Sequence, residues 1–149
     1  MSAAGLLTII GGSESMKIRK LIEERRQGER AAVSERVDPS DADLLAALDR
    51  LDGAEFSSTA FVTEDETVMA IGGGGDGGYV VSITLDDDAR IYTLVDRSKS
   101  EDHDQSVVVG GQSGSYQQYQ CVCRELAKEA ILYFQQQGAP SPKLQWVSE

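Results

Sequence analysis

The segment of residues 58–109 constrains the fold most, because it contains short apolar runs separated by short polar turns. In residues 79–85, one set of side chains is apolar at every second position, which is typical of a strand with one buried face. Strands joined by connections this short are antiparallel neighbours. The pattern predicts five strands: 58–63, 67–71, 79–85, 90–95 and 105–109. Residues 96–104 and 110–115 are predicted to be loops.

Two helices and a last strand are predicted around this segment. Asp38 fits the N-cap and Pro39 the first turn of a helix whose leucines, from Leu44 to Leu51, form one apolar stripe before Gly53. A longer amphipathic helix is predicted over residues 117–137, ended by Gly138. Residues 143–147, with the single Trp146, are predicted to form a short strand. The expected fold is α+β: an antiparallel sheet of about five or six strands with two helices packed on it.

The first part of the chain is less decisive. Residues 17–36 suit either a charged helix that ends at Gly28 or two edge strands that turn there, and we favour the strands. We therefore divide the 149 residues into an N-terminal extension or edge elements (1–29) and a single α+β domain (30–149).

Charge is unevenly distributed and excludes some classes of partner. The net charge is −11, and residues 37–149 hold seven basic and twenty acidic side chains, a net charge of −13. Phosphates would be repelled, so binding to nucleic acid or to an anionic membrane is not expected. No apolar run reaches the length of a membrane span, and the N-terminus lacks the basic region of a secretory signal. We expect a cytoplasmic protein.

The residues that most often carry chemistry do not converge in this sequence. Gly72-x-Gly74-x-x-Gly77 leads into a strand and contains Asp76, so we interpret it as hairpin glycines and not as a dinucleotide site. His103 lies alone in a polar loop. The Asp86–Asp88 run lacks the glycine of a calcium loop. We expect no catalytic residue, no metal ligand and no cofactor, and predict that the protein is not an enzyme.

The two cysteines lie two positions apart in the predicted second helix, where a disulfide between them is geometrically poor. Cys123 falls on the apolar stripe and is predicted to pack in the core. Cys121 is predicted to lie nearer the surface. Free thiols are typical of a reducing compartment.

The last third of the chain carries an ordered set of motifs. Gly110-Gly111-Gln112 precedes a tyrosine and the long helix, which ends in residues 130–134, and Gly138, Pro142, Leu144 and Trp146 follow. This order resembles the first-numbered family of immunity proteins in bacterial polymorphic toxin systems. The resemblance covers about Arg30 to Val147, including the capped helix and the strands before and after Tyr79.

The resemblance implies a cytosolic antidote that binds one cognate toxin as a 1:1 heterodimer. Related toxins are nucleases or nucleic-acid deaminases, whose basic grooves would attract an acidic inhibitor that occludes the substrate site. We expect the contacts on acidic turns, supported by aromatic and amide anchors. The candidates are Glu64, Asp65, Glu66, Asp86, Asp87, Asp88, Glu101, Asp102, Asp104, Gln112, Tyr116 and Gln117.

Two alternatives stay open. The first is an enzyme that reverses a toxin's modification by means of loop carboxylates. The second is an adaptor or assembly protein with no toxin target, which a large apolar surface patch would favour.

Overall fold

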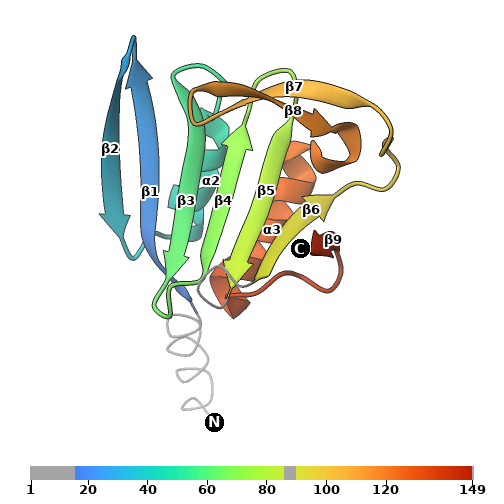
Figure 1. The fold of residues 1–149 in the computed structure, drawn as a ribbon. Coiled ribbons are helices and arrows are strands. Elements are labelled where there is room, and N and C mark those ends of the chain that lie inside the picture. Colours follow the sequence, from blue (N-terminus) through green and yellow to red (C-terminus); the bar gives the residue numbers. More distant parts are fainter. Residues whose placement is uncertain (1–15, 86–89, 149) are drawn as a thin grey trace.

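The computed structural model describes residues 16–85 and 90–148, which form a seven-stranded antiparallel sheet with helices on one face (Figure 1). The order across the sheet is β2-β1-β3-β4-β5-β6-β9, and every pair is antiparallel. The strands are β1 (Ile18–Gln27), β2 (Arg30–Val37), β3 (Phe56–Thr63), β4 (Val68–Gly73), β5 (Tyr79–Leu85), β6 (Arg90–Val95) and β9 (Gln145–Ser148).

The α+β class, the antiparallel sheet and the two packed helices are confirmed, but the sheet has seven strands where five or six were predicted. Residues 18–37 form the β1–β2 hairpin that the strand interpretation favoured, with the turn at Gly28. Because β1 pairs with β2 on one side and β3 on the other, both strands extend the sheet. The boundary proposed between residues 29 and 30 lies in the turn of this hairpin, and residues 1–15 lie outside the described part.

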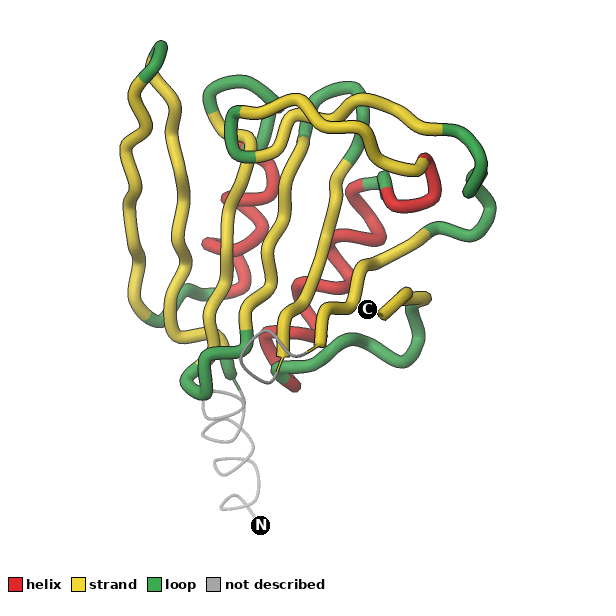
Figure 2. Tube along the Cα trace, in the orientation of Figure 1, coloured by secondary structure: helices red, strands yellow, loops and turns green. Residues whose placement is uncertain are grey.

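The two α-helices of the described residues, α2 (Asp41–Arg50) and α3 (Arg124–Gln137), cover one face of the sheet (Figure 2). The core lies between the helices and the strands. The fully buried side chains there include Phe61, Met69, Ile83, Ile131 and Phe134, each with 0 % of its surface exposed. Burial of large apolar side chains between a sheet and its helices supplies most of the stabilisation of such a layer.

The start of α2 differs from the prediction by two residues. Ser40, not Asp38, is the N-cap: its hydroxyl accepts from the Asp43 amide, and the Asp43 carboxylate accepts from the Ser40 amide. This reciprocal pair is a capping box, which satisfies two amide donors at once. Asp38 instead adopts φ 50° and ends β2, with its amide bonded to the Arg19 carbonyl.

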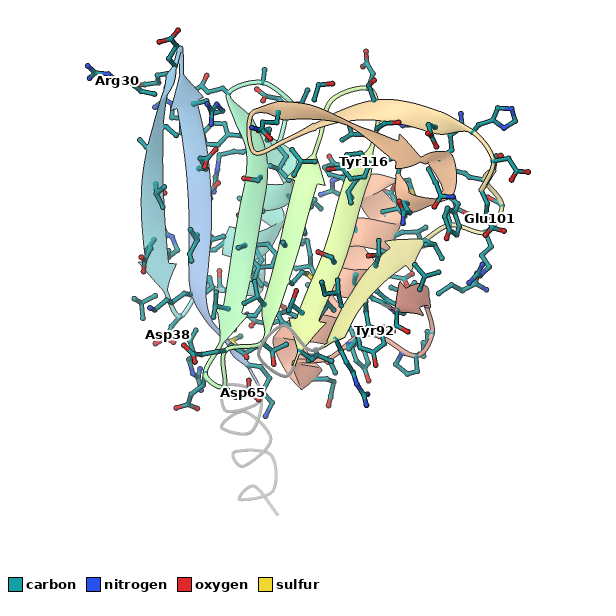
Figure 3. All side chains as sticks on the ribbon, viewed as in Figure 1. Arg30, Asp38, Asp65, Tyr92, Glu101 and Tyr116 are labelled. Carbon is teal, nitrogen blue, oxygen red and sulfur yellow. The ribbon has the colours of Figure 1, made fainter. Side chains whose placement is uncertain are left out.

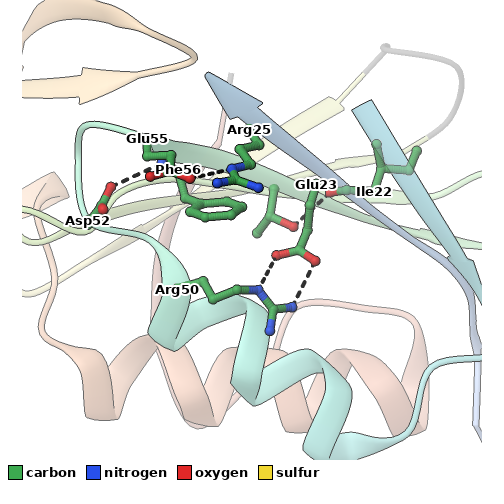
Figure 4. A network of polar contacts seen from close by, with 8 residues as sticks. Ile22, Glu23, Arg25, Arg50, Asp52, Glu55 and Phe56 are labelled. Atoms are coloured by element: carbon green, nitrogen blue, oxygen red, sulfur yellow. Dashed lines mark hydrogen bonds and ion pairs between the residues drawn. The ribbon is translucent and has the colours of Figure 1, made fainter. Parts of the chain in front are cut away.

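A network of polar contacts joins β1 to α2 and to the start of β3 (Figure 4). Arg50 donates from two nitrogens to the Glu23 carboxylate, at 2.7 and 2.8 Å. Arg25 pairs with Glu55 in the connection between α2 and β3. Bidentate arginine–carboxylate contacts fix orientation as well as adding energy, so the network holds the β1–β2 hairpin against the helical layer.

A second, two-stranded sheet lies on the other face of the molecule. Its strands are β7 (Asp104–Val109) and β8 (Gln112–Gln117), joined by Gly110 and Gly111 at φ 60° and 80°. The prediction that residues 110–115 are a loop is therefore wrong, and so is the expectation that residues 105–109 extend the main sheet. Two successive glycines with positive φ form the tight turn that suits a twisted hairpin, and β9 takes the place beside β6.

The start of the second helix was also predicted too early. Gln117 is the last residue of β8, a single 3₁₀ turn (η1, Gln118–Gln120) follows, and α3 begins only at Arg124. Cys121 is therefore buried and Cys123, the N-cap of α3, is exposed, the reverse of the prediction. Both are free thiols. The end of the helix is confirmed, since Gly138 caps it at φ 65°.

Candidate functional site

The sheet face opposite α2 and α3 is lined by small and β-branched side chains. The strand register places Ala60, Ala70, Ser82 and Thr93 in one row across β3, β4, β5 and β6. In antiparallel sheets with one solvated face, the solvated positions are usually polar, in alternation with the buried ones. Small apolar and hydroxyl side chains in their place leave a face that costs less to desolvate than a charged one.

The β7–β8 hairpin crosses this face at one end (Figure 1). Residues of the hairpin and of the sheet line a groove of about 380 Å³ there. None of the described lining side chains carries a formal charge. The lining residues are Ser58, Ala70, Ile71, Gly72, Val80, Ser82, Ile91, Thr93, Val109, Tyr116 and Gln120. An uncharged hollow bordered by a tyrosine can accept an apolar side chain of a partner.

Glycines in β4 and in the β4–β5 turn let the hairpin lie directly on the sheet. A Cβ at Gly72 would overlap Val109, and one at Gly77 would come within 2.9 Å of the Ser106 carbonyl oxygen. The Gln105 side-chain amide also donates to the Gly77 carbonyl. The interpretation of this glycine run as a hairpin connection is confirmed, because β4 and β5 pair directly across it.

Of the three predicted anchors, only Tyr116 faces the groove. Tyr116 is half-buried and lies on the same face of the hairpin as Gln105, the β7 residue with which it pairs. Gln112 is exposed at the other end of β8, beside the glycine turn. Gln117 is exposed on the outer side of the hairpin, where its amide donates to the Glu101 carbonyl at 2.8 Å.

The acidic residues Glu101, Asp102 and Asp104 are all exposed beside this end of the hairpin. Hydrogen bonds hold the loop in place: the Ser100 hydroxyl accepts from the Asp102 amide at 3.0 Å and contacts Nδ1 of His103 at 2.8 Å. His103 is exposed, as expected of a loop histidine. Glu101 and Asp102 therefore project from an ordered loop and Asp104 from the start of β7, and this order lowers the entropy cost of binding.

The Glu64–Glu66 turn lies at the opposite end of the sheet, where Figure 3 shows Asp65 far from both Glu101 and Tyr116. Glu64 and Asp65 line a hollow of about 490 Å³ together with the basic residues Lys17 and Arg19. The acidic positions thus form at least two separate surfaces. Asp86, Asp87 and Asp88 lie outside the described residues.

Carboxyl groups with shifted pKa values serve the fold. Hydrogen bonds from the Ala54 and Phe56 amides lower the pKa of Asp52, and the Ser98 hydroxyl lowers that of Asp96. The Thr63 hydroxyl likewise lowers the pKa of Asp65. A general acid needs a raised pKa, which burial without a donor would produce. Within residues 16–85 and 90–148, no three His, Cys, Asp or Glu side chains converge to hold a metal ion.

Comparisons with known proteins add no relative: no family model matches the chain, and neither a curated protein nor a solved structure matches it significantly. Over the described residues, no helix has the length and apolar character needed to cross a membrane.

The groove itself was not predicted from the sequence. Its floor comes from positions such as Ala70, Ser82 and Thr93, which the alternation marks only as the less buried face of each strand. A signal was present, because these positions carry small or hydroxyl side chains where a solvated face usually carries charge. The pattern cannot reveal that β7 and β8 leave the main sheet and border this face.

Proposed function

We propose that this chain is an immunity-type protein that binds a cognate bacterial toxin domain and occludes its substrate site. The observation that carries the proposal is the uncharged groove beneath Tyr116. The exposed carboxylates of Glu101, Asp102 and Asp104 lie beside Gln117, at the same end of β8 as Tyr116. A desolvated centre next to a charged rim is the usual anatomy of a protein interface. The toxin class proposed is a nuclease or nucleic-acid deaminase that acts in the cytoplasm.

In this proposal the groove and the carboxylates contribute to binding in different ways. The groove takes an apolar side chain of the toxin, and Tyr116 packs against it while its hydroxyl bonds at the edge. The carboxylates attract the basic groove of an enzyme whose substrate is a polyanion, which speeds encounter more than it strengthens the complex. With residues 37–149 at a net charge of −13, the attraction extends beyond the contact itself.

We give the acidic positions different ranks in this proposal, because they lie at different ends of the molecule. Glu101, Asp102 and Asp104 share one end of the molecule with Tyr116 and Gln117, so these five form the proposed contact. Glu64 and Asp65 lie next to Lys17 and Arg19, which partly neutralise them. We propose that this distant turn contributes little to the contact.

The decisive experiment starts from the genome neighbourhood. The toxin-like gene adjacent to this one is expressed as an inactive variant, and complex formation is measured by co-purification and calorimetry. We expect a 1:1 complex. Replacement of Tyr116 by Ala should weaken it by roughly 30-fold or more, since aromatic anchors contribute about 2 kcal/mol or more. The matched control is Tyr133→Ala, a half-buried tyrosine of α3 on the other side of the sheet.

The same assay separates the alternatives. Occlusion predicts that protection of cells and binding fall together in the Tyr116→Ala variant. An enzyme that reverses the toxin's modification predicts lost protection with intact binding after carboxylate replacement. Absence of a toxin-like neighbour, together with no capture of one, would overturn the proposal.

An adaptor role is the second candidate, favoured by Val33 and Val37, whose side chains are 64 % and 70 % exposed. It predicts partners that are not toxins and no protection of cells in a toxin challenge.

A further inference from the structure

The outer edge of the sheet offers a surface that the proposed toxin contact does not use. All eight residues of β2 are exposed, and among residues 16–85 and 90–148 β2 pairs with β1 alone. Val33 and Val37 are the exposed large hydrophobic side chains of the described residues. Ser34 pairs with Glu23 and Arg36 pairs with Leu21, and these positions face the helices. Because side chains alternate along a strand, Val33 and Val37 face the opposite side of the sheet.

Two hydrogen bonds show which backbone amides of β2 point to the open edge. The Arg26 amide donates to Glu55, toward β3, so its partner Ala31 is a non-hydrogen-bonded position of the β1–β2 ladder. The Asp38 amide donates inward, to Arg19. Since the direction alternates along an antiparallel strand, the amides of Ala31, Val33, Glu35 and Val37 point to the open edge. A long open edge of this kind is a template for another strand.

We propose that β2 pairs with β2 of a second copy of this chain, antiparallel, about a two-fold axis at Ser34. A two-fold axis perpendicular to the sheet pairs only positions that share a face, so few registers exist. Centring on Val33 sets Arg30 against Arg36, and centring on Glu35 sets that carboxylate against itself. Centring on Ala32 sets Glu29 against Glu35.

The Ser34 register avoids a directly opposed pair of like charges. It places Val33 opposite Glu35 and Ala31 opposite Val37, and the backbone groups of these four residues point toward the second copy. It also places Arg30 opposite Asp38. Diagonal neighbours then bring the valines of the two copies within reach of one another. Each Glu35 keeps the ammonium of Lys20 at 4.0 Å on its own β1, which offsets the approach of the two carboxylates.

The resulting dimer would be one continuous sheet with both grooves on the same side. Because β2 is at the opposite edge of the sheet order from β6 and β9, the groove beneath Tyr116 stays accessible in each copy. The inference is independent of the proposed toxin target.

The first test measures mass. Sedimentation equilibrium of the full chain should show a mass that rises from that of one chain, 16.1 kDa, toward twice that value as concentration increases. Val33→Pro removes an amide that points to the open edge and donates no hydrogen bond to β1. Proline is tolerated at such edge positions. We expect this variant to be monomeric, with its unfolding temperature nearly unchanged.

The second test measures register by cross-linking in a Cys123→Ser background, which removes the exposed native thiol. Opposed Cα atoms at a non-hydrogen-bonded pair are about 4.5 Å apart, within the range that a disulfide spans. Ser34→Cys should therefore cross-link to its own copy under mild oxidation. Ala32→Cys is the matched control: it lies on the same face, but its two copies are about 13 Å apart in this register.

A constant mass of one chain at all concentrations would overturn the proposal. So would equal cross-linking of the Ser34→Cys and Ala32→Cys variants, or a dimer that persists unchanged in Val33→Pro. None of these three results bears on toxin binding, which is measured with the Val33→Pro variant and should be retained at one toxin per chain.

Discussion

Gly72 is the residue at which the main sheet and the hairpin come closest. It needs no unusual backbone angle, yet any side chain would overlap the Val109 methyl groups. The glycine is therefore required by a contact that is distant in the sequence. Cys121 is the C-cap of η1 and lies outside α3, so its burial does not follow from a helical period.

At this scale we predict that Gly72→Ala lowers the free energy of unfolding by about 1–3 kcal/mol, the usual cost of overpacking. The reason is the overlap with Val109. Chemical denaturation of the single variants and of Gly72→Ala/Val109→Ala forms the test. The loss should be recovered in large part in the double variant, and strictly additive effects would contradict this account.

The individual elements differ in how local their causes are. Patterns that are contiguous in the sequence, namely apolar stripes, helix caps and short turns, account for α2 and for the β3–β4, β4–β5 and β5–β6 pairs. The predicted bounds of β6, Arg90–Val95, are confirmed to the residue. β8 has almost no apolar pattern, since its residues are QSGSYQ. It forms a strand because the Gly110–Gly111 turn folds it back along β7.

The connection between α2 and β3 carries a prediction about pH. The Asp52 carboxylate accepts from the Ala54 and Phe56 amides at 2.9 and 3.0 Å, which lowers its pKa below the ordinary 3.8. A lowered folded-state pKa contributes stability that is present above the ordinary value and is lost as pH falls through the lowered one. The unfolding free energy should therefore decline in this acidic window, and less steeply in Asp52→Asn.

Urea denaturation at a series of pH values from 7 down to about 2 checks this expectation. Asp76→Asn, an exposed acid in the glycine turn, is the matched control and should keep the slope of the parent protein. A decline of equal steepness in the parent and in Asp52→Asn would count against the role assigned to these two amide contacts.

The whole molecule combines a high negative charge with an uncharged groove, and the two features predict different salt responses. The association rate with a basic toxin domain should fall roughly ten-fold or more between low salt and about 0.5 M salt, because screening acts on long-range attraction. The dissociation rate should change much less, since contacts in the groove are short-ranged.

Stopped-flow binding over this salt range measures both rates. Replacing Glu101, Asp102 and Asp104 by their amides should flatten the salt dependence of association. The control replaces Glu64, Asp65 and Glu66 in the same way, which removes equal charge at the opposite end of the sheet. Equal effects of the two triple variants would indicate net charge alone and would reject a contact at the hairpin end.

The sequence by itself determined the α+β class, the antiparallel order of β3 to β6 and the two helices, because alternation, caps and short connections act between near neighbours. Only the tertiary structure decided where β7, β8 and β9 lie, which cysteine is buried, and that Tyr116 stands over a groove while Asp65 lies at the far end of the sheet. Those outcomes depend on which strand edges and faces remain open once the core has formed, and that competition involves residues far apart along the chain.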